Sequence, residues 1–131
     1  MNTRPVTNLK SLRSNVGGQF AVAIRESGMV VPKGISMGAF ALLREMAAQD
    51  GIMPAATTTC AARAGAVCQP AKAMGIVIKA GWAGYVAPMK HYRLTPTGHA
   101  VLREATEKGL MATLRELEER LEEAARAHAK A

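Results

Sequence analysis

Two lysines seven residues apart, Lys72 and Lys79, are the side chains whose type and spacing first suggest a chemical task. On a helix predicted at about residues 69–80 they share one side with Gly75 and Ile76, because 3.6 residues complete a helical turn. Two ammonium groups beside a small residue suit close approach to the phosphate backbone and groove of a nucleic acid. Any solvated helix also carries lysines on its outer face, so this helix alone leaves both interpretations open.

The two cysteines, Cys60 and Cys68, suggest a second kind of chemistry. Cys68 lies near the expected start of the lysine-bearing helix, where the helix dipole stabilises a thiolate and favours oxidation. The alternative is that both thiols pack as small buried hydrophobic groups. Two cysteines are too few for a disulfide framework, and His91, His99 and His128 have no metal-ligand spacing. With no glycine-rich phosphate loop and no paired acids in the basic part of the chain, we expect no enzyme, cofactor or metal.

The charge of the chain is unevenly distributed. There are 17 Lys and Arg against 10 Asp and Glu, a net charge of +7. Residues 1–100 hold eleven of these cations and three acids, whereas residues 101–131 hold six and seven. Apolar residues make up 49% of the sequence but aromatic residues only 4%, which predicts a single, mainly helical domain with an aliphatic core. A basic body with a neutral tail indicates an anionic partner such as nucleic acid.

The stretch KHYRLTPTGHAVLREA, residues 90–105, contains the most informative local pattern. Residues 82–86 and 92–94 are predicted to form two short strands around a turn at 87–90, which makes a small β-hairpin. Thr95 is expected to cap the next helix and Pro96 to take its first position, where a missing N–H costs nothing. A hairpin between a helical stretch and a capped helix is the arrangement of a winged helix.

Three further helical segments are predicted before the lysine-bearing helix. Residues 7–27 carry apolar side chains three or four apart, but Gly17-Gly18 interrupts them, so one weak helix and two short ones both fit. Ser36 is expected to cap a helix that continues to Gln49 and stops at the following glycine. Part of residues 54–63 is predicted to form the third.

Leucines step by four and three residues through the C-terminal segment 106–129, as in the apolar seam of a coiled coil. One helix cannot bury such a seam alone. It must pack on the N-terminal helix of its own chain or on another subunit, and we expect both. Gly109 should separate this helix from the one after the hairpin. The predicted dimerisation residues are Leu9, Leu12, Val16, Phe20, Ile24, Leu110, Leu114, Leu117 and Leu121.

Three segments resemble, in order and spacing, the MarR group of winged-helix transcriptional regulators. GISMGAFALLREMAAQDG, residues 34–51, is similar to the second helix of that group, and AKAMGIVIKAGW, residues 71–82, to its recognition helix and the turn into the wing. YRLTPTGHAVL, residues 92–102, is similar to its strand, its Leu-Thr-x-x-Gly turn and the following helix, and is the most specific. The chain departs from the group in its short hairpin tip, in a recognition helix without arginine, and in a longer spacing over residues 51–65.

The resemblance implies a winged helix-turn-helix core at residues 34–105 with flanking dimerisation helices at 7–27 and 106–129, in one domain spanning 1–131. It also implies a homodimer that places one helix of each subunit in the major groove of double-stranded DNA. The implied base contacts are Gln69, Lys72, Ala73 and Ile76. The implied backbone contacts are Lys79, Lys90, His91 and Arg93, with Arg63 and Thr57–Thr59 adding to them from the preceding helix. Many members sense a small molecule, but no residue here identifies one.

Two classes of function fit these observations. The first is a dimeric, sequence-specific DNA-binding regulator, acting as a repressor in the cytoplasm. The second is a winged-helix accessory protein that binds another protein and does not depend on DNA. No apolar stretch approaches the roughly 18 residues of a membrane span, so we expect a soluble protein. The first 25 residues contain four cations and no acid, a composition that would also suit a transit peptide.

Overall fold

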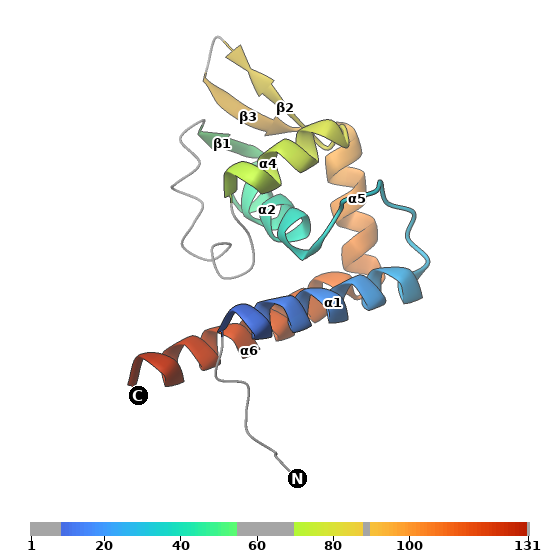
Figure 1. Ribbon diagram of the computed structural model, residues 1–131. Helices are drawn as coiled ribbons and strands as arrows, with labels where there is room; N and C mark the ends of the chain where they lie inside the picture. Colours follow the sequence, from blue (N-terminus) through green and yellow to red (C-terminus); the bar gives the residue numbers. More distant parts are fainter. Residues whose placement is uncertain (1–8, 55–69, 88–89, 131) are drawn as a thin grey trace.

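The computed structural model describes residues 9–54, 70–87 and 90–130 (Figure 1). These residues are mainly helical, with one small antiparallel sheet, and their arrangement is compatible with a winged helix. In chain order the elements are α1 (Leu9–Ser27), α2 (Met37–Ala48), β1 (Ile52–Pro54), α4 (Pro70–Lys79), β2 (Ala83–Val86), β3 (His91–Leu94), α5 (Pro96–Glu107) and α6 (Leu110–Lys130).

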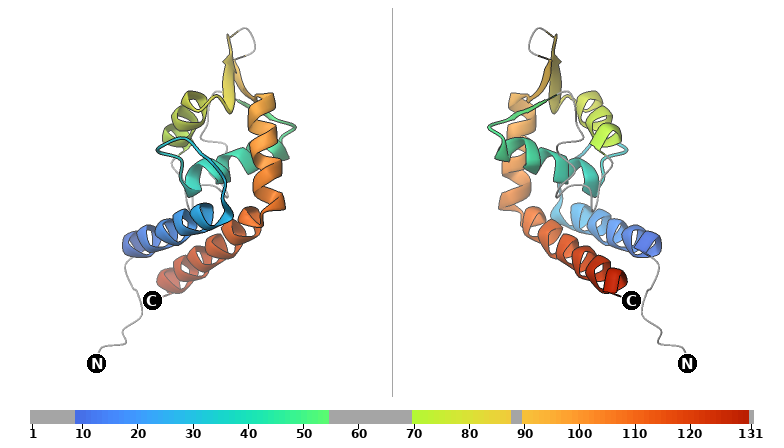
Figure 2. Two further views of the ribbon diagram at one scale, coloured as in Figure 1. Left: turned by 90° about the vertical axis from the view of Figure 1, so that its right-hand side faces the viewer. Right: turned by 90° about the vertical axis from the view of Figure 1, so that its left-hand side faces the viewer.

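The N-terminal segment is one helix, because α1 continues through Gly17 and Gly18 without a break. It runs antiparallel to α6, so the two helices form one layer at the end of the molecule opposite the β2–β3 hairpin (Figures 1 and 2). The Nζ of Lys108, just before α6, donates to the carbonyl of Ser27 at 3.1 Å. Farther toward the start of α1, the side-chain oxygen of Gln19 accepts a hydrogen bond of 3.0 Å from Arg120 of α6.

The leucine seam of α6 is buried within a single chain, against α1 and the body. The buried side chains are Val16, Phe20, Ile24, Leu110, Leu114, Leu117 and Leu121, all at most 6% exposed. Leu12 is half-buried, and the side chain of Leu9 lies outside the described residues. The seam was expected to serve an interface between subunits as well. That part of the expectation is wrong for the seven buried residues, because packing inside the chain leaves them no surface for a partner.

Helix α2 is the centre of the core. Every side chain from Ala39 to Leu43 is fully buried, and so is Met46. The Phe40 ring contacts Phe20 of α1 edge-on, with centroids 5.5 Å apart, and lies 5.8 Å from the ring of Trp82. Ser36 occupies the N-cap position as predicted, but its side chain makes no capping bond. Its backbone carbonyl accepts the first helical hydrogen bonds instead.

The sheet has three strands in the order β1-β3-β2, all antiparallel. The two strands of the hairpin were predicted to within one residue at their first positions, whereas β1 was not predicted. Asp50 and Gly51 both have positive φ, 61° and 78°, and turn the chain sharply after α2. This turn brings Ile52 opposite Arg93. The amide of Leu94 also donates to the Gly51 carbonyl at 2.8 Å, which attaches β3 to the end of α2.

The Leu-Thr-x-x-Gly sequence joins three elements at the base of the hairpin. The Thr95 hydroxyl accepts a 3.0 Å hydrogen bond from the Gly98 amide, as an N-cap should, and donates to the Gly81 carbonyl at 2.6 Å. The Thr95 amide donates to the Trp82 carbonyl at 3.0 Å. A Cβ on Gly98 would lie 2.1 Å from that same carbonyl oxygen, so only glycine fits. The end of α4, the start of β2 and the start of α5 are therefore held together.

A sharp bend separates the last two helices. Gly109, between α5 and α6, has a φ of 79°, a conformation that glycine adopts without strain, and the predicted break is confirmed. Across residues 9–54, 70–87 and 90–130, no helix combines the length and the apolar character that crossing a membrane requires.

Candidate nucleic-acid interface

Helix α4 forms an outer layer of the molecule and exposes one side to solvent. In the side views it lies on the far side of α2 from α5, below the hairpin (Figure 2). Ala73, Met74 and Val77 face inward and are buried. Lys72, Gly75 and Lys79 are exposed on the opposite side. The spacing of the two lysines thus corresponds to one shared, solvent-facing surface.

Two of the apolar residues implied as base contacts have different positions on this helix. Ala73 is buried at 4% exposure, so the expectation that it faces bases is wrong. It lies next to Val77 on the inward side, where α4 packs on α2 and has no room for a ligand. Ile76 is half-buried at the edge of the exposed side, and part of its side chain is accessible. The lysine-bearing face is therefore narrower than the sequence indicated.

The hairpin carries a second group of cations. Lys90 is exposed in the turn, where its φ is 52°, Arg93 is exposed on β3, and His91 is half-buried beside them. Arg93 lies opposite Gly84 of β2, which has no side chain to cover it. Within the described part of the chain, neither Lys90 nor Arg93 forms a salt bridge or a side-chain hydrogen bond, and the same holds for Lys72 and Lys79. Their charges are free to meet an anion.

The stretch of sequence that contains α4 and the hairpin carries positive charge and no carboxylate. Residues 51–103 contain six Lys and Arg and no Asp or Glu. The nearest acids along the chain are Asp50 and Glu104, at its two borders. A run of cations without acids attracts polyanions from a distance of about a Debye length, roughly 8 Å at physiological salt.

The remaining sequence-predicted residues of this region lie outside the described residues. They are Thr57–Thr59, Cys60, Arg63, Cys68 and Gln69. The structure therefore brings together Lys72, Ile76 and Lys79 on one element and Lys90, His91 and Arg93 on another, while the base contact of Gln69 and the thiol hypothesis stay predictions.

Sequence reasoning missed a pair of tyrosines on the hairpin. Tyr85 of β2 and Tyr92 of β3 lie directly opposite each other, with ring centroids 5.2 Å apart and planes at 58°. Tyr92 is half-buried, whereas Tyr85 is 49% exposed. The signal was present in the sequence, since both predicted strands contain a tyrosine at a position that alternation places on one face.

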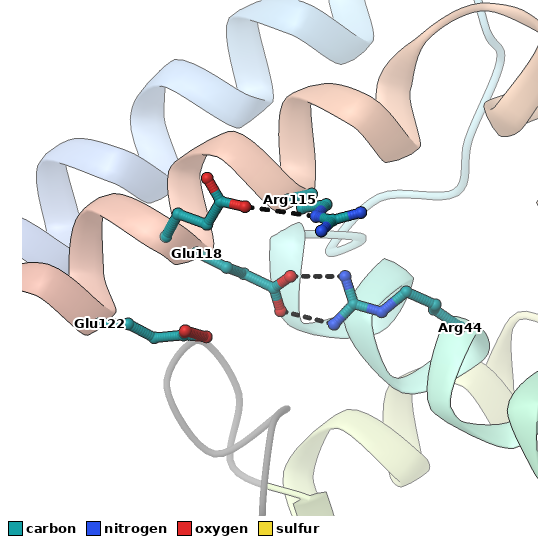
Figure 3. A pocket seen from close by; sticks show the side chains of 5 residues that line it. Arg44, Arg115, Glu118 and Glu122 are labelled. Atoms are coloured by element: carbon teal, nitrogen blue, oxygen red, sulfur yellow. Dashed lines mark hydrogen bonds and ion pairs between the residues drawn. The ribbon is translucent and has the colours of Figure 1, made fainter.

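A second missed feature is a salt bridge between the body and the C-terminal helix. Figure 3 shows Arg44 of α2 and Glu118 of α6 pointing toward each other, joined by two hydrogen bonds of 2.5 and 2.6 Å. The hydrogen bond to Glu118 raises the pKa of Arg44 above its usual value. The pair lines a cavity of about 350 Å³ that Arg115, Glu119 and Glu122 also line.

Both arginines of this cavity are paired with glutamates. Arg44 is paired with Glu118, and Arg115 is 3.3 Å from Glu119. The pair of Arg44 and Glu118 thus attaches α6 to α2, away from the unpaired cations Lys72, Lys79, Lys90 and Arg93 on α4 and the hairpin.

Comparison of the chain with protein-family models, with curated proteins and with solved structures finds no match.

Proposed function

We propose that this protein is a winged-helix regulator that binds double-stranded DNA, with α4 as the recognition helix and the β2–β3 hairpin as the wing. The observation that carries the proposal is the set of unpaired, exposed cations on both elements, Lys72, Lys79, Lys90 and Arg93, within an acid-free stretch of sequence. Such cations can neutralise phosphates, and the order of helix, hairpin and capped helix fits the arrangement of a winged helix.

The dimensions of α4 suit the major groove. An α-helix with its side chains is about 10–12 Å across and the groove is about 12 Å wide, while the ten residues of α4 span about 15 Å along it. Lys72, in the first turn, can reach a guanine edge, and the accessible part of Ile76 can contact a thymine methyl group. Gly75 lies between them on the exposed side and allows the backbone to approach closely.

The positive charges of both elements, that of Lys72 included, also neutralise phosphates and supply affinity that is independent of sequence. If Lys72, Lys79, Lys90 and Arg93 neutralise four phosphates, log K falls with log salt at a slope of about −3.6. Raising the salt from about 50 to 200 mM would then weaken binding about 100-fold per protomer.

The regulator we propose is a non-catalytic cytoplasmic homodimer that represses transcription by occupying its site. Because the leucine seam is buried within the chain, the second subunit would have to use the outer side of the α1–α6 layer, where Val22 is 43% exposed. A two-fold dimer would place two recognition helices about one turn of DNA apart and would favour a pseudo-palindromic site. Sedimentation equilibrium tests the dimer separately, since a monomer at all concentrations would remove it and leave DNA binding by one subunit.

Titration with random-sequence duplex DNA at about 50 and 200 mM salt tests the proposal, together with two charge reversals. Lys72→Glu should lower affinity at least tenfold and reduce the salt slope by about 1. Arg25→Glu changes the net charge by the same amount at an exposed position of α1, at the end of the molecule opposite the hairpin. This variant should bind DNA nearly as tightly as the natural protein does. Equal losses in both variants would show that total charge alone is responsible. Absence of binding even at 50 mM salt would overturn the proposal and favour an accessory protein that binds another protein.

A further inference from the structure

The β2–β3 hairpin has two chemically different faces. Directly opposed residues of an antiparallel pair lie on the same face, and alternate residues share it. One face therefore carries the pair Ala83 and Leu94 near the base and the pair Tyr85 and Tyr92 farther out. The inner pair is buried among the helices at 3% exposure, whereas Tyr85 extends beyond this cover. The outer part of the apolar face of the hairpin is thus not covered by the helices.

The other face and the turn of the hairpin each carry a cation, Arg93 and Lys90. Arg93 is opposite Gly84, and His91 is opposite Val86, on the face that the tyrosines do not occupy. Lys90 is exposed where the two strands join. No acid occurs in residues 51–103, so no carboxylate of this stretch opposes an anionic ligand here. An aromatic face with cations at its tip and back matches a nucleic-acid strand, which has aromatic bases on one side and phosphates on the other.

Tyr85 is exceptional among the aromatic residues. The protein has only five, and Phe20, Phe40 and Trp82 are buried in the core. The Tyr85 ring contacts that of Tyr92, which limits the conformations that it can adopt and so reduces the entropy lost on binding a ligand. A half-exposed ring held by a neighbouring ring offers a flat surface for stacking.

We propose that Tyr85, supported by Tyr92, stacks against an unpaired DNA base, so that the protein prefers duplexes with a single-stranded extension. This inference rests on the proposed function, since α4 would hold the adjoining duplex. An intact duplex presents base edges in its grooves, and only an unpaired base has a face free to meet an aromatic ring. Stacking of this kind changes affinity by about 5- to 150-fold per base.

The experiment compares three DNA molecules that share one 16-base-pair duplex, by fluorescence anisotropy at fixed salt. The first has blunt ends, the second a four-nucleotide thymidine extension, and the third an extension of four abasic sites. The abasic extension keeps the phosphates and removes the bases, so a difference between the last two reports base contacts alone. We expect the natural protein to bind the thymidine extension about tenfold more tightly than the abasic one.

Three substitutions assign this difference to the ring. Tyr85→Phe keeps the aromatic face and should keep the preference. Tyr85→Leu keeps an apolar side chain of similar burial, and Tyr85→Ala removes it. Both should bind the two extensions equally and the blunt duplex as before. The far-ultraviolet circular dichroism of each variant shows whether it is folded, and the leucine variant decides the question if the alanine variant is not.

Equal affinity of the natural protein for the thymidine and abasic extensions would overturn this inference and leave the proposed function intact. A preference that survives in Tyr85→Leu would overturn it too, because the bases would then be bound elsewhere. Failure to bind the blunt duplex at low salt would refute the proposed function instead, and with it the premise of this inference.

Discussion

Removing either partner of the salt bridge between Arg44 and Glu118 should lower the free energy of unfolding by about 2–3 kcal/mol. The two hydrogen bonds of 2.5 and 2.6 Å make a bidentate pair, and the Glu118 side chain is only 8% exposed. Losing one partner of a fully buried pair costs about 3–5 kcal/mol, and an exposed pair contributes about 0.2–1 kcal/mol. Because the Arg44 side chain is 29% exposed, the expected cost lies between these limits.

Urea denaturation of Arg44→Ala, Glu118→Ala and the double variant measures the coupling energy, which we expect to be about 1–2 kcal/mol. Arg115 and Glu119 provide the matched control on α6. They form a 3.3 Å pair with side chains that are 80% and 61% exposed, so their coupling energy should be below about 0.5 kcal/mol and should vanish in 1 M salt. Coupling of Arg44 with Glu118 no larger than that of the control would refute the reasoning.

Three further predictions concern single residues. Gly98→Ala should destabilise the protein by about 3 kcal/mol, because the added methyl group would overlap the Trp82 carbonyl. The control Gly75→Ala, on the exposed side of α4, meets nothing within 4 Å and should stabilise the protein by up to about 1 kcal/mol. Similar urea midpoints for the two variants would contradict this. Thr95→Ala removes the cap and the bond to the end of α4, so the melting temperature should fall by about 4–8 °C, with Thr95→Ser much closer to the natural protein. Lys90→Gly removes the strain of a positive φ, so it should raise the free energy of unfolding by about 1 kcal/mol and the melting temperature by a few degrees. The salt slope of DNA binding should decrease by about 0.9. A less stable variant would show that the turn is not strained.

The parts of the fold that the sequence predicted well are those set by local chemistry. Thr95, Pro96 and Gly98 act within four residues of one another, so the start of α5 could be predicted from the cap, the proline and the glycine. The break at Gly109 and the seam of α6 also depend on spacing along one helix. Even so, the 3.6-residue period does not say which neighbour covers an apolar seam. The pattern was consistent with burial against α1 and with burial against a second subunit.

The features that were missed depend on residues far apart in the chain. Strand β1 is three residues long, and it forms only because Asp50 and Gly51 turn the chain toward β3. Arg44 and Glu118 are 74 positions apart, and nothing near either residue indicates its partner. The inward placement of Ala73 follows from which side of α4 packs on α2, where Met74 and Val77 are buried as well. Tertiary packing decides which side of a helix faces its neighbour when apolar residues lie on more than one side.

The contact between Phe40 and Trp82 has a practical consequence. Trp82 is the protein's single tryptophan, and it lies where α4 ends and the hairpin begins, with its ring against the central helix and its carbonyl bound to the Thr95 amide. Its indole fluorescence therefore reports, without any attached dye, whether the β-sheet stays packed against the helices. A red shift in that emission at denaturant concentrations where helical ellipticity persists would reveal a partly opened form.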